Sequence, residues 1–179
     1  MKKDLARVLL SREEIAEKIK EVAARITEDY KGESVLFVCI LKGSVHFYSD
    51  LTREIDLPLT MDFMSISSYG AGTTSSGEVK MLKDLDKTIN GKHVIIVEDI
   101  IDSGNTLSYL KRLLSSRQPA SIKICTLLDK PSRRKVDLTP DYCCFTIPDE
   151  FVVGYGLDYD ELYRNEKEIY VLDPAVYSE

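Results

Sequence analysis

The sequence predicts an α/β fold: a mostly parallel twisted sheet flanked by helices. Three observations lead to this prediction. Short uninterrupted apolar runs suit strands that are covered on both faces. Amphipathic segments between those runs suit helices, and strands that alternate with helices form parallel βαβ units. The length of 179 residues favours one domain with a substantial core.

The N-terminal part of the chain supplies the first three predicted elements. Ser11 and Glu14 form a capping box that starts a helix, and Gly32 is suited to end it. A buried strand is predicted over Val35–Leu41 and a second helix over Val45–Ile55. The apolar residues of the first helix recur at helical spacing: Ile15, Ile19, Val22, Ala23 and Ile26.

The middle of the chain alternates between loops and further elements. Leu59–Phe63 has the period of a half-buried strand, whereas Ser65–Gly77 is rich in Ser, Gly and Thr and is expected to form a loop. From Lys130 the chain is irregular until its last strand. The remaining elements are predicted as a strand over His93–Glu98, a helix over Leu107–Leu114, and strands over Ile122–Leu128 and Ile169–Leu172.

Composition excludes several classes of function. The formal charge of −6 argues against a general nucleic-acid or anionic-membrane binder, which would be basic. The four cysteines form no C-x-x-C pair and accompany no His cluster, so a zinc site is not expected. No apolar run reaches the length of a membrane span, and the N-terminus does not resemble a secretory signal. A cytoplasmic location is therefore expected.

The segment Val94–Leu107 carries the most specific chemistry. A buried strand leads to adjacent carboxylates, Glu98 and Asp99, and a loop with one glycine then leads to a helix that begins at about Thr106. Backbone N–H groups and the helix dipole favour a phosphate there. Carboxylates do not bind phosphate, so they need sugar hydroxyls or a hard divalent cation. Together these features indicate a phosphorylated ribose, although a strand ending in solvated acids before a capped helix is the simpler alternative.

This segment resembles the ribose-phosphate signature of the type I phosphoribosyltransferases. The similarity extends from about Ser11 to Tyr177 and implies the fold of that family in one domain, 1–179. A core over about 34–130 would carry a small purine-binding hood, formed by the N-terminal segment and about 131–179. Further matches narrow the resemblance to the hypoxanthine-guanine group: Leu41-Lys42-Gly43, Ser68-Tyr69-Gly70, Lys130, Phe151–Tyr159 and Arg164.

The resemblance implies a purine salvage reaction that needs Mg²⁺. Phosphoribosyl pyrophosphate would react with hypoxanthine or guanine to give IMP or GMP and pyrophosphate. Asp102 would be the general base at the purine ring nitrogen, with a helix-capping acid as the alternative. Glu98 and Asp99 would lie under the ribose hydroxyls near Mg²⁺, and Asp158 would hold a second Mg²⁺. The residues implied for the 5-phosphate are Ser103, Gly104, Asn105 and Thr106.

The pyrophosphate and the purine have their own implied residues. Backbone groups of Lys42 and Gly43, often after a cis peptide bond, would bind pyrophosphate together with Arg164. Ser68 and Tyr69 would close over it from a lid at Ser67–Gly77. The alternatives are a surface lysine, surface ion pairs for Asp158 and Arg164, and a plain loop.

The purine would lie in the hood. Phe151 would stack on its ring, and Val152 would contact its edge through backbone groups. Lys130 would donate a hydrogen bond to the 6-oxo group, which disfavours adenine because its amino group would leave that donor unpaired. The alternative for Phe151 is ordinary core packing.

Other functions remain open. An RNA-binding regulator on this fold would need a broad basic face, whereas Arg133-Arg134-Lys135 is one short basic run that suits a solvated turn. A Rossmann-like nucleotide binder would need G-x-G-x-x-G after the first strand, and Leu41–Ser44 is not one. A related enzyme could prefer xanthine. A homodimer or homotetramer is expected from the resemblance and from the prevalence of symmetric assembly.

Overall fold

The computed structural model describes residues 2–68 and 79–178. Its first long helix, α1 (Arg12–Asp29), confirms the predicted capping box. The Glu14 N–H donates to Ser11 Oγ at 3.2 Å, and the Ser11 N–H donates to Glu14 Oε2 at 2.8 Å. The five apolar residues of the predicted stripe are all buried. Local capping and helical periodicity are therefore sufficient to define this element.

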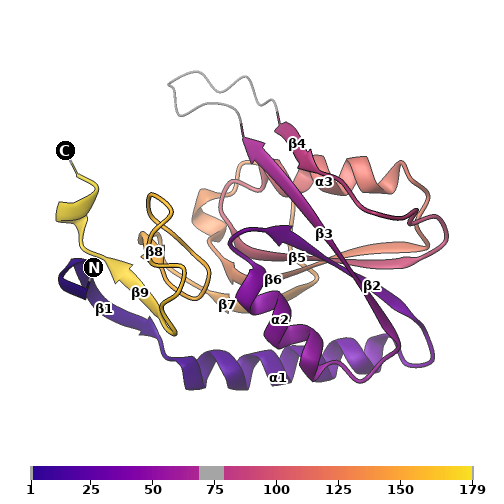
Figure 1. Ribbon diagram of the computed structural model, residues 1–179, viewed down its shortest axis with the longest axis horizontal. Helices are drawn as coiled ribbons and strands as arrows, with labels where there is room; N and C mark the ends of the chain where they lie inside the picture. The colour runs from indigo at the N-terminus through magenta and orange to yellow at the C-terminus, as the bar shows by residue number, and fades with distance from the viewer. Residues whose placement is uncertain (1, 69–78, 179) are drawn as a thin grey trace.

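A mostly parallel sheet forms the centre of the molecule (Figure 1). Within the described residues it has six strands, and all neighbouring pairs are parallel except β3 and β4. The carboxyl ends of the parallel strands therefore meet at one edge. The strands lie in the order β4 (Val79–Lys83), β3 (Leu59–Ser68), β2 (Val35–Leu41), β5 (His93–Ile101), β6 (Ser121–Asp129) and β7 (Tyr142–Thr146).

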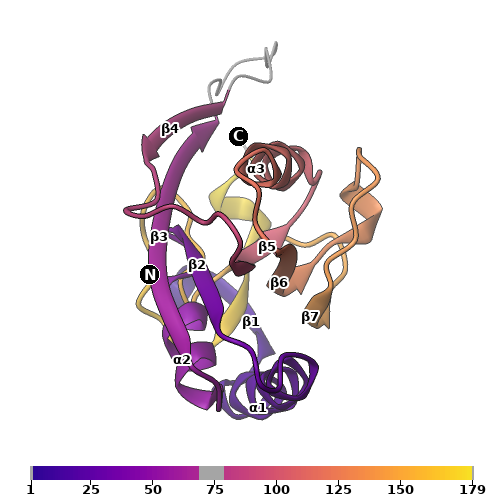
Figure 2. The same cartoon turned by 90° about the vertical axis from the view of Figure 1, so that its right-hand side faces the viewer.

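Helices cover both faces of this sheet (Figure 2). On one face lie α1 and α2 (Val45–Glu54), and on the other lies α3 (Asn105–Ser115). Alternate residues of β2 pack into the two layers: Phe37 and Cys39 join the cluster with α1 and α2, while Val38 and Ile40 join the cluster with α3. Because both faces of the strand are buried, its sequence is continuously apolar.

A small antiparallel sheet adjoins the large one and lies near both chain ends (Figure 1). It consists of β1 (Leu5–Leu10), β9 (Ile169–Leu172) and β8 (Val152–Val153), in that order. Only β9 was predicted from the sequence. Most of β1 is exposed or partly exposed, so it lacks a continuous apolar pattern, and β8 has only two residues. Long-range pairing, rather than local sequence, defines this sheet.

Two strands run further than their sequences predict. Ser65–Ser68 was expected to belong to a loop, but it extends β3 because it pairs with β4, which was not predicted. The strand expected to end at Glu98 continues to Ile101, since Ile100 and Ile101 pair with β6. On the other side of β5, the pairing with β2 ends at Val97. Glu98 and Asp99 therefore lie where β5 is no longer paired with β2.

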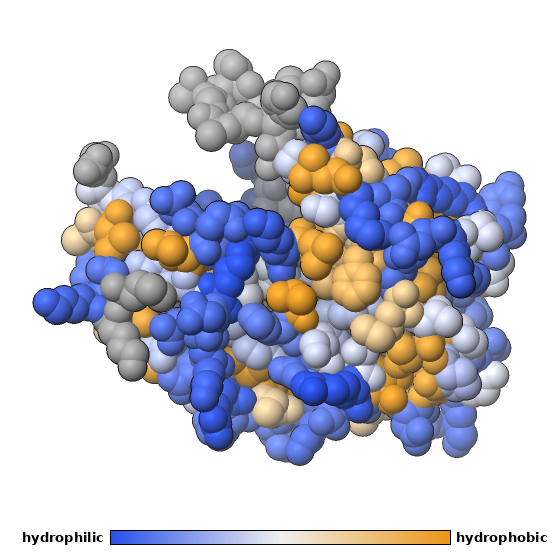
Figure 3. Space-filling view, viewed as in Figure 1, coloured by the Kyte–Doolittle hydropathy of each residue, from blue (hydrophilic) through white to orange (hydrophobic). Residues whose placement is uncertain are grey.

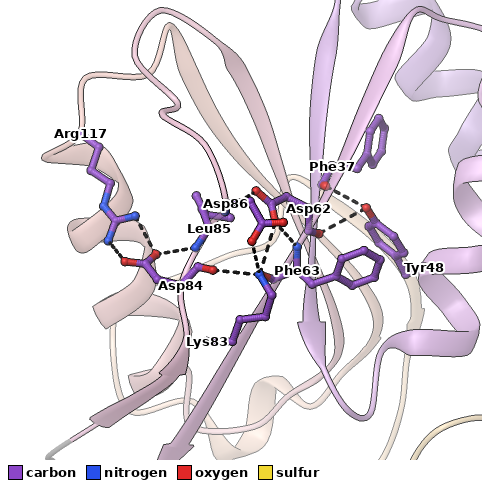
Figure 4. A network of polar contacts seen from close by, with 9 residues as sticks. All are labelled: Phe37, Tyr48, Asp62, Phe63, Lys83, Asp84, Leu85, Asp86 and Arg117. Carbon is purple, nitrogen blue, oxygen red and sulfur yellow. Dashed lines mark hydrogen bonds and ion pairs between the residues drawn. The ribbon is translucent and has the colours of Figure 1, made fainter.

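A polar network secures the β3–β4 hairpin to the rest of the sheet (Figure 4). The buried Asp62 carboxylate accepts from the Asp86 N–H at 2.9 Å and lies 3.7 Å from the Lys83 ammonium, which also contacts Asp86 at 3.0 Å. Arg117, just after α3, donates to both carboxylate oxygens of Asp84 at 2.8 and 2.7 Å. These contacts attach the loop after β4 to β3 and to the end of α3.

The described residues form no large apolar patch on the face drawn in Figure 3. Apolar side chains on the face shown in Figure 3 form separate patches between charged ones, a distribution that is ordinary for a monomer surface. None of the helices within residues 2–68 and 79–178 is long and apolar enough to cross a membrane. Cys39 and Cys125 are buried and unpaired, as their apolar surroundings predict.

Candidate active site

Two adjacent carboxylates lie within the last part of β5. Glu98 is 9% exposed and accepts a hydrogen bond from the Asp99 N–H at 3.1 Å. Burial raises the pKa of Glu98 well above its usual range, and the neighbouring Asp99 carboxylate raises it further. Burial also raises the pKa of Asp99. A cation or a hydrogen-bond donor at this position would stabilise the ionised pair.

Three chain segments meet at Asp99 because two glycines permit close contact. A Cβ on Gly43, in the loop after β2, would lie 1.8 Å from Asp99 Oδ2. A Cβ on Gly156 would lie 2.1 Å from the Gly43 carbonyl oxygen, and Gly156 has a φ of 103°. A side chain at position 43 would displace the Asp99 carboxylate, and one at position 156 would collide with backbone and would need a positive φ that favours glycine. The Leu41–Lys42 peptide bond is cis, in agreement with the resemblance.

The loop from β5 to α3 forms a hollow of about 140 Å³. Gly104 has a φ of 80° and directly precedes α3, which begins at Asn105, one residue before the expected start. The Asn105 N–H donates to Ser103 Oγ at 3.3 Å. Backbone N–H groups at a helix start suit an anion. The hollow is lined by Glu98, Asp102, Ser103, Gly104 and Thr106, among others.

Asp102 and Lys130 lie side by side at the ends of neighbouring strands. The Lys130 ammonium is 3.8 Å from Asp102 Oδ1, and the lysine side chain is only 7% exposed. Asp102 Oδ1 is itself buried and has no hydrogen-bond partner among the described residues. A buried carboxylate oxygen that accepts no hydrogen bond from the protein is suited to bind an N–H group of a ligand.

A larger cavity of about 310 Å³ shares Asp102 with the hollow. It brings together residues that the sequence places far apart, and a cavity of this size can hold a small organic ligand. The Phe151 side chain is 38% exposed and thus available for stacking. The residues expected from the sequence that line it are Asp99, Asp102, Lys130, Phe151, Val152 and Asp158.

Two cationic side chains near the expected pyrophosphate position, Lys42 and Arg164, are joined by a residue that was not predicted. Glu161 lies 2.8 Å from the Lys42 ammonium and 3.3 Å from the Arg164 guanidinium. Arg164 also pairs with Asp158 at 3.0 Å and donates to the Gly156 carbonyl oxygen at 2.8 Å. The fold thus brings Lys42, Asp158 and Arg164 together. Glu161 lies in a turn with a φ of 65°, and its sequence context carries no signal of this role.

The expected lid residues and the expected metal ligands do not form a single cluster in the described part of the chain. Tyr69 and most of Ser67–Gly77 lie outside the described residues, and Ser68 is the last residue of β3. In the part of the chain that the structure describes, no three His, Cys, Asp or Glu side chains are arranged to hold a metal ion. Asp158 therefore does not form a three-carboxylate site with Glu98 and Asp99.

Other residues of the site were missed by sequence reasoning. Arg133 and Asp149 form an ion pair at 2.6 Å, and both line the larger cavity, as does Tyr177. Arg134 was expected in a solvated turn, but its side chain is only 14% exposed and pairs with Asp129. Its Nε also donates to the Asp102 carbonyl oxygen at 3.1 Å. A run of three basic residues gives no indication of which one faces inward.

Comparisons with known proteins agree with this geometry. A family model described as a phosphoribosyl transferase domain matches residues 8–160. The chain is 55% identical over 177 residues to a hypoxanthine-guanine phosphoribosyltransferase of Bacillus subtilis, covering 99% of this chain and 98% of that protein. A relative of the same name from Streptococcus thermophilus is 51% identical over 178 residues, with 99% of each chain covered. A crystal structure of a hypoxanthine phosphoribosyltransferase from Staphylococcus aureus superposes with a TM-score of 0.96 at 52% identity, covering 100% of this chain and 97% of that one.

Proposed function

The chain belongs to the phosphoribosyltransferase family, within its hypoxanthine-guanine group, and we propose that it carries out purine salvage. In this reaction the 5-phosphoribosyl group of phosphoribosyl pyrophosphate is transferred to hypoxanthine or guanine, giving IMP or GMP and pyrophosphate. One observation carries the assignment: Asp102 and Lys130 lie side by side in a cavity with Phe151, directly next to the anion-binding hollow at the start of α3.

Base recognition is assigned to the larger cavity. The purine stacks on Phe151, and backbone groups of Val152 contact its edge. The Lys130 ammonium donates to the 6-oxo group. Adenine has an amino group at this position, so it would present a donor instead of an acceptor to the buried Lys130 ammonium, which is a strong basis for discrimination.

The transfer step is assigned to Asp102. The glycosidic bond from C1 of the ribose to pyrophosphate breaks while a bond from C1 to a purine nitrogen forms. A ring N–H proton of the purine passes to Asp102 Oδ1, which is buried and, among the described residues, has no hydrogen-bond partner. Ser103, Gly104, Asn105 and Thr106 hold the 5-phosphate, so that C1 lies near the shared boundary of the two hollows.

The carboxylates of β5 suit Mg²⁺ bound with the substrate. Mg²⁺ usually retains several waters and binds one or two carboxylates together with substrate phosphates, so the adjacent pair of the buried Glu98 and the partly buried Asp99 fits that pattern. Glu98 and Asp99 would hold the ribose hydroxyls and this ion, which when bound neutralises charge on the departing pyrophosphate. Asp158 is the proposed ligand of a second Mg²⁺.

Pyrophosphate binding requires a change of partners. The Gly43 backbone, Arg164 and Lys42 are assigned to pyrophosphate, with Ser68 and Tyr69 closing over it. Glu161 contacts both cations in this structure, so pyrophosphate oxygens would replace that carboxylate.

We also propose that the protein is a cytoplasmic homodimer or homotetramer. Its support is the membership of the family and the free cysteines, which suit a reducing compartment.

A panel of bases tests this proposal. The purified protein is incubated with phosphoribosyl pyrophosphate and one of hypoxanthine, guanine, xanthine, adenine or uracil, with and without Mg²⁺, and nucleotide formation is measured. We expect Mg²⁺-dependent turnover of hypoxanthine and guanine and none of adenine or uracil. Turnover of adenine at a comparable rate would contradict the role of Lys130, and full activity in chelator would contradict the role of Mg²⁺.

A further inference from the structure

The C-terminal turn of the chain brings an aromatic side chain to the larger cavity. Tyr177 follows the short helix Pro174–Val176, whose N-cap residue Asp173 accepts from the Ala175 N–H at 2.9 Å. The Tyr159 hydroxyl donates to the Val176 carbonyl oxygen at 3.4 Å, and Val176 packs against the small apolar cluster around Val153. These contacts fix the position from which Tyr177 extends.

The rings of Phe151, Tyr159 and Tyr177 form a compact group. The centroids of Phe151 and Tyr177 are 5.0 Å apart with a 30° angle between the ring planes. Tyr159 meets Phe151 edge-on, at 5.6 Å and 88°. Both distances lie within the favourable range for aromatic pairs. Phe151 is thus held by one ring that is tilted by 30° and by one that is almost perpendicular.

This spacing leaves no room for a purine between Phe151 and Tyr177. An inserted ring would separate the two centroids by roughly 7 Å, twice the ~3.5 Å contact distance of stacked carbons. If the base stacks on Phe151, it must therefore use the face opposite Tyr177. Both side chains are 38% exposed and both line the cavity, so Phe151 retains accessible surface after it has contacted Tyr177.

We propose that Tyr177 is a base-positioning residue, which supports one face of the Phe151 ring so that the other face receives the purine. This inference rests on the proposed function. A ring without this support can rotate between rotamers in the free enzyme, and a base must then select the one orientation that stacks. The effect belongs to base binding, because Tyr177 is not among the residues that line the hollow at the start of α3.

Four variants test the proposal. Tyr177→Ala removes the ring, and Tyr177→Phe keeps it. A chain that ends at Val176 also lacks the ring, and a chain that ends at Tyr177 is its matched control. The KM values for hypoxanthine and for phosphoribosyl pyrophosphate, kcat, and the Kd of GMP from calorimetry are measured for each. Thermal unfolding confirms that each variant is folded.

The two ring-less variants should raise the KM for hypoxanthine and the Kd of GMP about 3- to 10-fold. Their KM for phosphoribosyl pyrophosphate should stay within about twofold, and Tyr177→Phe and the control truncation should behave as wild type. A fall in the KM for hypoxanthine would mean that Tyr177 blocks the base, and an unchanged value would mean that Phe151 needs no support. Either result would overturn the role of Tyr177. The proposed function would still stand if the wild-type protein formed nucleotide. An inactive wild-type protein would overturn both.

Discussion

The two halves of the site are built in different ways. The hollow that suits the sugar phosphate comes from one continuous segment, Glu98–Leu107, at the carboxyl edge of the large sheet. The cavity that suits the base takes residues from the ends of β5 and β6, from the turns around β8, and from the C-terminus. A local segment can be recognised from its own sequence. An assembled cavity depends on pairings between β1, β8 and β9 that no local pattern encodes.

This difference predicts that the chemistry resides in the local segment and that base affinity resides in the assembled cavity. Replacing Asp102 by Asn keeps the size of the side chain but removes the proposed proton acceptor. We expect kcat to fall about 10²- to 10⁴-fold, the usual contribution of a general base, with a much smaller change in the KM for hypoxanthine. Steady-state kinetics with saturating phosphoribosyl pyrophosphate measure both quantities.

Asp149→Asn is the matched control for Asp102→Asn, because Asp149 lines the same cavity but lies outside the local segment. Its kcat should remain within about threefold of wild type. If both variants lost activity equally, the chemistry would not be confined to the local segment. A kcat near the wild-type value for Asp102→Asn would require another general base.

Arg134 connects the two halves, so its loss should have the second-largest effect. The guanidinium contacts the Asp129 carboxylate and the carbonyl oxygens of Asp102 and Leu138. The side chains of Arg134 and Asp129 are only 14% and 10% exposed. Arg134→Met would leave a buried carboxylate unpaired, and we expect the free energy of unfolding to fall by about 3–5 kcal/mol. Urea unfolding at neutral pH measures this change.

An exposed ion pair provides the control for Arg134→Met. Arg117 and Asp84 form a two-point contact at the surface, where the side chains are 31% and 46% exposed (Figure 4). Arg117→Met should cost at most about 1 kcal/mol, because water can solvate the remaining carboxylate. Adding Asp129→Asn to Arg134→Met should recover part of the lost stability. Equal losses in the two arginine variants would show that burial of the Arg134 pair is not decisive.

The difference between the local segment and the assembled cavity also explains which parts of the structure could be predicted from the sequence. The helix at Arg12–Asp29 and the strands at Val35–Leu41 and Ile169–Leu172 were predicted, since capping and continuous apolar runs are local signals. The residues of Glu98–Leu107 likewise predicted a phosphate-binding segment, and the structure forms a hollow there. In the assembled cavity, Lys130, Phe151 and Val152 were expected only through family resemblance.

The parts that were missed depend on long-range contacts. Glu161 contacts Lys42, which lies 119 positions earlier in the sequence, and Tyr177 contacts the ring of Phe151. Arg134 was assigned to a solvated turn because its neighbours in the sequence are also basic. Its burial follows from the closeness of Gly104, where a Cβ would lie 2.9 Å from the Arg134 Cδ. The contact between Gly104 and Arg134 joins residues thirty positions apart, so no local pattern could predict it.

Tyr155→Phe should produce the smallest change. It tests whether the turns of the assembled cavity also position the loop at Lys42 and Gly43, which is proposed to bind pyrophosphate. The buried Tyr155 hydroxyl donates to Asp50 Oδ2 of α2 at 2.5 Å, and the next residue, Gly156, lies against the Gly43 carbonyl oxygen. Burial and the Asp50 carboxylate raise the pKa of Tyr155, so the phenol remains a donor at neutral pH. Losing this bond should cost about 1 kcal/mol of stability, because the partly exposed Asp50 can be solvated by water. We expect the KM for phosphoribosyl pyrophosphate to rise about two- to threefold, in line with a shift of less than 1 kcal/mol.

Tyr163→Phe is the matched control, since it removes a hydroxyl that donates to Asp4 at 2.9 Å near the small sheet. An equal rise in the KM for phosphoribosyl pyrophosphate in Tyr163→Phe would indicate that both variants destabilise the assembled cavity in general. A rise in Tyr155→Phe alone would indicate that the effect is transmitted through the contact between Gly43 and Gly156.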